Sequence, residues 1–66
     1  MTIKPVQCRM LVGQQQRGRT FTEHMDLKDP ESIRALARTL AEERRLDPEK
    51  AVLEVKQNGR WVPYRP

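Results

Sequence analysis

The fold is decided by the stretch DPESIRALARTLAEERR, residues 29–45, which has the marks of an amphipathic helix. Asp29 is a typical N-cap residue, and Pro30 fits the first helical position, where the N–H that proline lacks would have no partner. Apolar residues then recur with the helical spacing i, i+3, i+4, i+7 and i+8. They are Ile33, Leu36, Ala37, Leu40 and Ala41. We therefore expect a helix over about residues 30–45 that needs a second layer to cover its apolar stripe.

The chain before the helix predicts two strands joined by a loop. Residues 5–12 alternate between apolar and polar side chains, which is typical of a half-buried strand. Residues 13–18 hold two glycines and three consecutive glutamines without periodicity, and we interpret them as a flexible loop. A second strand over residues 19–27 places Glu23 on its apolar face. Either Glu23 lies at an open end of the sheet, or a bulge re-aims it.

The dipeptide Asn58-Gly59 predicts a hairpin after the helix, because a type I′ turn needs two residues that tolerate positive φ. The turn joins strands over residues 51–57 and 60–64 and fixes their register. The expected pairs are Gln57–Arg60, Lys56–Trp61, Val55–Val62, Glu54–Pro63 and Leu53–Tyr64. Since side chains alternate along a strand, Trp61 should lie on the face opposite the core.

The element order β-β-α-β-β predicts a single α+β domain over residues 1–66, with one helix packed on a four-stranded antiparallel sheet. Pro63 lacks a backbone N–H, so the last strand belongs at a sheet edge, which favours the strand order 2-1-3-4. The rival is the order 2-1-4-3, which is loosely similar to β-grasp proteins and makes strands 1 and 4 parallel. The C-terminal Gly-Gly of ubiquitin is missing from this sequence, which ends Tyr64-Arg65-Pro66.

Composition narrows the classes of protein. No apolar run approaches the roughly 18 residues of a membrane span, and the first residues lead into a strand rather than into an apolar signal segment. The one cysteine, Cys8, cannot form an internal disulfide. We therefore expect a cytoplasmic protein without a membrane partner, and the small size alone suggests an accessory protein of a bacterium or phage. The net charge of +4 is concentrated in residues 1–19, which contain no acid and would suit nucleic acid, an anionic membrane surface or an acidic protein.

No group of residues in the sequence predicts catalysis. Cys8 should point to the core and His24 to the opposite face, so they cannot form a nucleophile–base pair. Ser32 falls in the first helical turn, where serine usually serves as a capping residue. One cysteine and one histidine lack the spacing of a metal motif, and the glycine-containing loop leads into a strand rather than a helix. We expect no enzymatic activity, cofactor, metal or small-molecule substrate.

The leading candidate site is the open face of the sheet, which we define as the face that the helix does not cover. A tryptophan there has no core to pack against, and Trp and Arg are enriched at interface hot spots. The candidate interface residues are Arg9, Leu11, Val52, Lys56 and Trp61. The simpler interpretation is that the stems of Lys56 and Arg60 cover the indole on a monomer surface. We predict a small protein-interaction or regulatory domain that binds a protein partner, or a second copy of itself, through this face.

The alternative function is a nucleic-acid-binding module that uses the basic loop Arg17-Gly18-Arg19. Basic hairpin tips can follow phosphates, and glutamines can hydrogen-bond base edges. The candidate residues are Arg9, Gln15, Arg17 and Arg19. Two features oppose this function: nine acidic residues are interspersed along the chain, and no aromatic ladder is present for base stacking.

Overall fold

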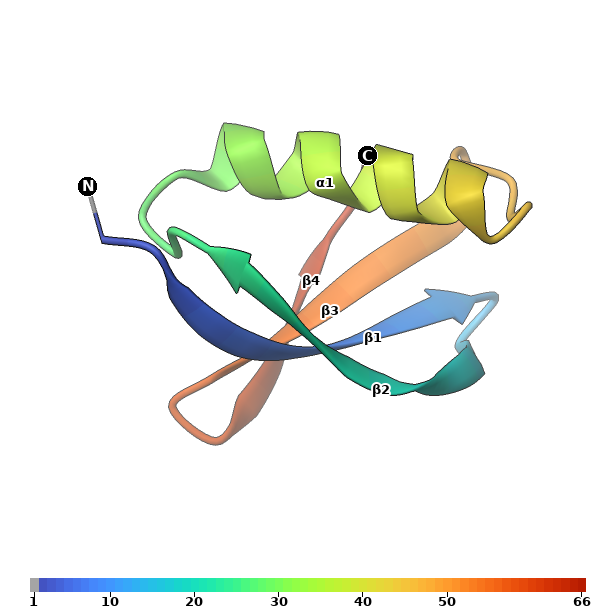
Figure 1. Cartoon of the computed structure of the whole chain (residues 1–66). Helices are drawn as coiled ribbons and strands as arrows, with labels where there is room; N and C mark the ends of the chain where they lie inside the picture. Colours follow the sequence, from blue (N-terminus) through green and yellow to red (C-terminus); the bar gives the residue numbers. More distant parts are fainter. Residues whose placement is uncertain (1) are drawn as a thin grey trace.

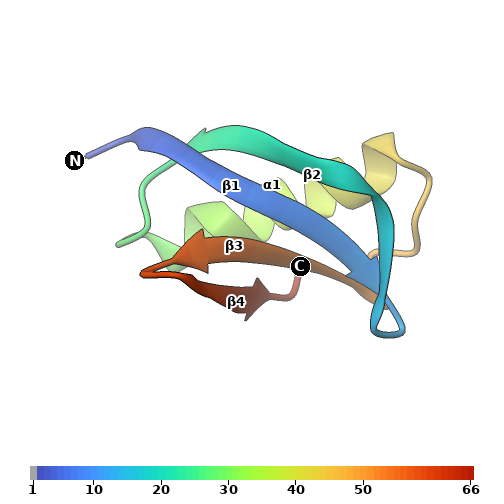
Figure 2. The same ribbon diagram turned by 90° about the horizontal axis from the view of Figure 1, so that it is seen from below.

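The computed structural model describes residues 2–66 as a four-stranded sheet with one helix lying across one face (Figure 1). The elements are β1 Lys4–Val12, β2 Gln15–Met25, α1 Pro30–Glu43, β3 Ala51–Gln57 and β4 Arg60–Tyr64. All neighbouring strands are antiparallel and follow the order β2-β1-β3-β4, which Figure 2 shows from the side opposite the helix. The predicted α+β fold and strand order are confirmed. The β-grasp-like order is wrong, because β1 pairs with β3 rather than with β4.

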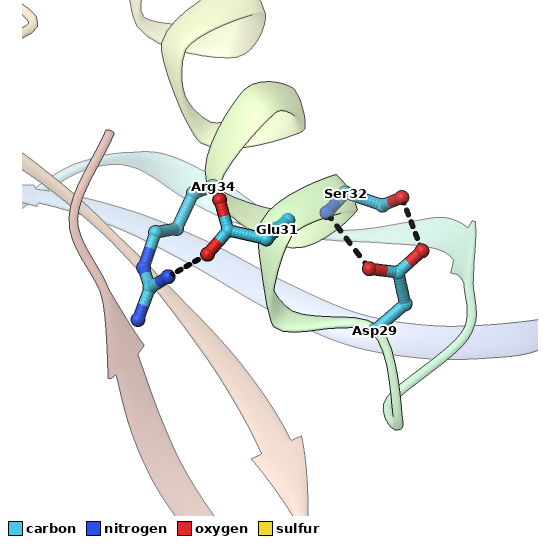
Figure 3. A network of polar contacts seen from close by, with 4 residues as sticks. All are labelled: Asp29, Glu31, Ser32 and Arg34. Carbon is cyan, nitrogen blue, oxygen red and sulfur yellow. Dashed lines mark hydrogen bonds and ion pairs between the residues drawn. The ribbon is translucent and has the colours of Figure 1, made fainter.

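The start of α1 is fixed by the predicted N-cap. The carboxylate of Asp29 accepts hydrogen bonds from the backbone N–H of Ser32 at 3.3 Å and from its hydroxyl at 2.6 Å (Figure 3). These hydrogen bonds from Ser32 lower the pKa of Asp29, the side-chain bond having the larger effect. Two residues after Asp29, Glu31 accepts a hydrogen bond from the guanidinium of Arg34. The first turn therefore satisfies a backbone donor that would otherwise face solvent.

The end of α1 comes earlier than the sequence predicted, at Glu43 rather than at Arg45. Arg45 adopts a left-handed φ of 57°, and the N–H of Leu46 donates to the carbonyl of Ala41 at 2.8 Å. The N–H of Arg45 donates to the carbonyl of Glu42 at 3.1 Å. These two bonds form a Schellman motif, which normally has glycine in the left-handed position. An arginine in that position explains why the sequence pattern did not reveal the helix end.

The core lies between α1 and the sheet and contains no buried polar or charged residue among those described. The strands contribute most of its side chains through alternate positions, and α1 contributes its predicted apolar stripe. The buried residues are Val6, Cys8, Met10, Met25, Ile33, Ala37, Leu40, Ala41, Ala51, Leu53 and Val55. Because these alternate positions point toward α1, the positions between them must face away from it.

The two hairpins differ in how well the sequence predicted them. In the second hairpin, Asn58 and Gly59 have positive φ, and all five predicted pairs from Gln57–Arg60 to Leu53–Tyr64 are confirmed. In the first, the predicted flexible loop over residues 13–18 is wrong. A two-residue turn with positive φ at Gly13 and Gln14 leads directly into β2.

A bulge in β2 resolves the position of Glu23. Cys8 faces Phe21 and Met10 faces Arg17, so residues 18–20 together stand opposite a single residue of β1. This bulge adds an even number of residues and leaves the alternation of faces unchanged. Glu23 consequently stays on the helix side, opposite Val6, where it is half-buried on the edge strand. The open edge therefore accounts for Glu23, and the idea that a bulge re-aims it is wrong.

Candidate functional site

The open face contains a tight group of four side chains that we call the tryptophan cluster: Arg9, Glu54, Lys56 and Trp61. The strand register places Arg9 directly opposite Glu54 and places Lys56 directly opposite Trp61. Nε and Nη2 of Arg9 both lie 2.7 Å from Oε1 of Glu54. The cluster thus joins β1, β3 and β4 by side chains, in addition to the backbone ladders.

The indole of Trp61 is contacted by two cationic groups. The guanidinium carbon of Arg9 lies 4.3 Å from the ring centroid, and Nζ of Lys56 lies 4.9 Å from it. Both distances fall within the range of cation–π attraction. Trp61 is consequently half-buried rather than exposed. The predicted cover from Lys56 is present, but its companion is Arg9 from another strand, and Arg60 is exposed.

The Arg9–Glu54 pair is more shielded than an ordinary surface ion pair. The side chains of Arg9 and Glu54 are 28% and 18% exposed, whereas those of the helix pair Arg38 and Glu42 are 58% and 59% exposed, with 3.9 Å between the charged atoms. Arg9 is therefore fixed both by a charged hydrogen bond and by the indole. Fixing its side chain in advance lowers the conformational entropy that a partner would have to remove on binding.

A shallow groove of about 490 Å³ continues the open face beside the tryptophan cluster. Its lining includes the apolar residues Leu11, Val52 and Pro63 and the charged residues Glu49, Lys50, Glu54 and Arg65. Leu11 and Val52 are direct neighbours across β1 and β3. The predicted interface residues Arg9, Leu11, Val52, Lys56 and Trp61 therefore all lie on one face. Pro63 and Arg65 were not predicted, and only the position of Pro63 opposite Glu54 in the hairpin register pointed to the groove.

The candidate residues for nucleic-acid binding do not form one site. Arg9 lies on the open face, whereas Arg17 lies on the helix side, because it pairs with the buried Met10. Arg19 stands in the bulge, and Gln15 pairs with Val12 at the start of β2. Arg17, Gly18 and Arg19 belong to an edge strand rather than to a loop, which corrects the predicted hairpin tip.

The remaining reactive groups are separated from one another. Cys8 is fully buried, and its Sγ donates to the carbonyl of Val6 at 3.4 Å. Burial raises the pKa of this thiol to about 11. His24 is exposed and pairs with Pro5 in β1, on the other face of the sheet. Within residues 2–66, no three His, Cys, Asp or Glu side chains converge as metal ligands would.

Neither a membrane-spanning helix in the described residues nor similarity to a known protein indicates where the site lies. In the described part of the chain, no helix is long and apolar enough to cross a membrane. Comparisons with protein-family models, with curated proteins and with solved structures give no match. The geometry of the open face is therefore the basis for assigning a function.

Proposed function

We propose that the chain is a small protein-interaction domain that binds its partner through the open face. The observation that carries this proposal is the position of a rigidly held tryptophan, Trp61, beside an apolar groove that no other element of residues 2–66 covers. A fixed aromatic anchor next to a groove is the arrangement in which most interface energy is concentrated. A regulatory role would follow from whatever this partner does.

The chemistry of the groove describes the partner. Its apolar lining of Leu11, Val52 and Pro63 fits one apolar side chain of a protein surface. Around it, Lys50, Lys56 and Arg65 have no ion pair within residues 2–66. They outnumber the acidic lining residues, which are Glu49 and Glu54, and Glu54 is already engaged by Arg9. We therefore expect a partner surface with an apolar residue surrounded by acidic groups. A second copy of the same chain is the other partner that the face admits.

The experiment uses three variants of the whole chain. Wild type, Trp61→Ala, Val52→Glu and the control Arg38→Ala, which changes the outer face of α1, are immobilised and exposed to lysate of the source cells. Captured proteins are quantified by mass spectrometry, and the oligomeric state of each variant is measured by sedimentation. We expect wild type and R38A to retain a partner, or to dimerise, and W61A and V52E to lose it at least tenfold.

The proposal is overturned if both open-face variants retain the partner, or dimerise, as well as wild type does. That result would show that another surface binds. Trp61 is the single tryptophan of the chain, so its fluorescence provides a second measurement with a purified partner. A saturable change in emission, lost in V52E, supports contact at this face. An emission that stays constant while binding saturates opposes it.

A further inference from the structure

A second surface lies where the end of α1 meets β2, on the side of the sheet that carries the helix. A hollow of about 290 Å³ is lined there by Arg17, Gly18, Arg44 and Leu46. The two arginines are far apart in the sequence, so only the fold brings them together. Their convergence on one hollow is the starting point for a site of opposite charge.

Each arginine is positioned by a distinct feature of the backbone. The bulge of β2 begins after Arg17, and the pairing of Arg17 with the buried Met10 directs it to the helix side. The Schellman motif ends α1 at the position where Arg44 leaves the helix. The guanidinium of Arg44 then lies 4.3 Å from the ring centroid of Phe21, a neighbour of the bulge on β2. Stacking on Phe21 holds this guanidinium while leaving its N–H donors free.

The charges around the hollow are not neutralised by the protein. Within residues 2–66, carboxylates pair with Arg9, Arg34 and Arg38, but none pairs with the four arginines of this region. Those four are Arg17, Arg19, Arg44 and Arg45. At the end of α1, the carbonyls of Leu40, Ala41 and Glu42 already accept from the backbone N–H groups of Arg44, Leu46 and Arg45.

We propose that Arg17 and Arg44 form a phosphate-binding site for the backbone of a nucleic acid. Arginine donors match a phosphate in geometry as well as in charge. Phe21 is covered by Arg44, Tyr64 packs against the core and Trp61 lies on the other face, so none of the three aromatic rings is free for base stacking at this site. The site therefore reads the backbone and not the base sequence. A lipid surface fits less well, since Ile3, the one large exposed apolar side chain among the described residues, precedes β1 at the opposite end of β2.

The test compares two double variants with the same change in charge. Binding of a labelled DNA duplex and a labelled single strand is measured by fluorescence anisotropy at several salt concentrations, for wild type, R17Q/R44Q and the control R34Q/R38Q. For the duplex, the slope of log K against log salt should be shallower by about 1.8 in R17Q/R44Q than in wild type. The reason is that each of the two lost phosphate contacts contributes about 0.9 to its steepness. The control should keep most of the slope, and R17K/R44K, which keeps both charges, should keep the slope while binding more weakly than wild type.

Other results would overturn the proposal in recognisable ways. An equal loss in the control R34Q/R38Q would mean that only the net charge matters. If inorganic phosphate shifts the NMR signals of the Arg17 and Arg44 side chains but neither DNA binds, the site takes a free phosphate. If vesicles with anionic lipid bind in an Arg17- and Arg44-dependent way and DNA does not, the ligand is a membrane. Since W61A leaves this region intact, its DNA binding should equal wild type, so this proposal and the open-face proposal can fail separately.

Discussion

The two faces of the sheet are built by different physical means. The helix side is apolar and holds all the buried residues, and within residues 2–66 it encloses no buried polar group. The open face is held together by an ion pair and two cation–π contacts around a half-buried indole. Burial of apolar area stabilises a domain, whereas a fixed polar and aromatic surface favours recognition. The comparison predicts that the helix side contributes most of the stability and that the open face can be altered at a smaller cost, and four measurements test that division.

The largest effect is expected from Leu53→Ala on the helix side. Leu53 is fully buried and lies between Met10 and Tyr64 in the sheet. Its truncation should lower the free energy of unfolding by about 2–5 kcal/mol, because it leaves a cavity in addition to losing apolar burial. Val52→Ala, at the next residue on the open face, should cost less than about 1 kcal/mol. Urea unfolding measures both values, and similar losses would contradict the division between the faces.

The next effect concerns Cys8, whose buried thiol should make the free energy of unfolding depend on pH in the alkaline range. Desolvation by burial raises the pKa of the Cys8 thiol from 9.0 to about 11, with a smaller contribution from the charge of Glu23, while a backbone hydrogen bond at Glu23 acts in the opposite direction. The folded protein therefore binds the thiol proton more tightly than the unfolded chain does. The free energy of unfolding should fall as pH rises from 9.0 toward about 11. Below 9.0 this contribution is fully present.

The difference between wild type and Cys8→Ala isolates the thiol from the other groups that titrate at high pH. Urea unfolding gives the free energy of unfolding of both proteins between about pH 8 and pH 11. The value for wild type minus the value for Cys8→Ala should fall steadily as pH rises. Parallel curves would show that the buried thiol ionises as easily in the folded protein as in the unfolded chain.

The sequence predicted the second hairpin residue by residue because one dipeptide determines it. Asn58-Gly59 tolerates positive φ at both turn positions, and every pair then follows from the alternation of strands. The first hairpin uses the same two positive φ values at Gly13 and Gln14. Glutamine is an uncommon residue in that conformation, so the turn resembles the start of a disordered stretch. The polar residues after it give no alternation from which the beginning of β2 could be recognised.

The candidate site was predictable only as far as strand register determines it. Register alone put Trp61 on the open face beside Lys56, and put Val52 on the same face further along β3. The contact of Arg9 with Trp61 depends on the order of β1, β3 and β4, which followed from Pro63 at the edge. The hollow between Arg17 and Arg44 could not be predicted, because it depends on a bulge and on an arginine in a left-handed helix end.

A smaller effect on stability is expected for Trp61→Ala, although it removes the largest side chain. Trp61 is half-buried and packs against charged groups rather than against the core. We expect a loss of about 1–2 kcal/mol in the free energy of unfolding, from partial apolar burial and the cation–π contacts. Trp61→Phe should recover part of it. Urea unfolding gives the values, and a loss as large as that of Leu53→Ala would place Trp61 in the stabilising core instead of on a binding face.

The smallest effect should come from the Arg9–Glu54 pair, and it measures how far the open face is organised before binding. A double-mutant cycle with Arg9→Met and Glu54→Gln gives the coupling energy between the two side chains. We expect about 0.5–1 kcal/mol, because the pair is shielded and Arg9 is also held by Trp61, whereas the exposed pair Arg38–Glu42 should give about 0.3 kcal/mol. Repeating the cycle in a Trp61→Ala background should lower the Arg9–Glu54 coupling, since Arg9 then gains freedom. A coupling energy that is unchanged without the indole would mean that the ion pair and the cation–π contact are independent. The tryptophan cluster would then be two separate contacts rather than one rigid anchor.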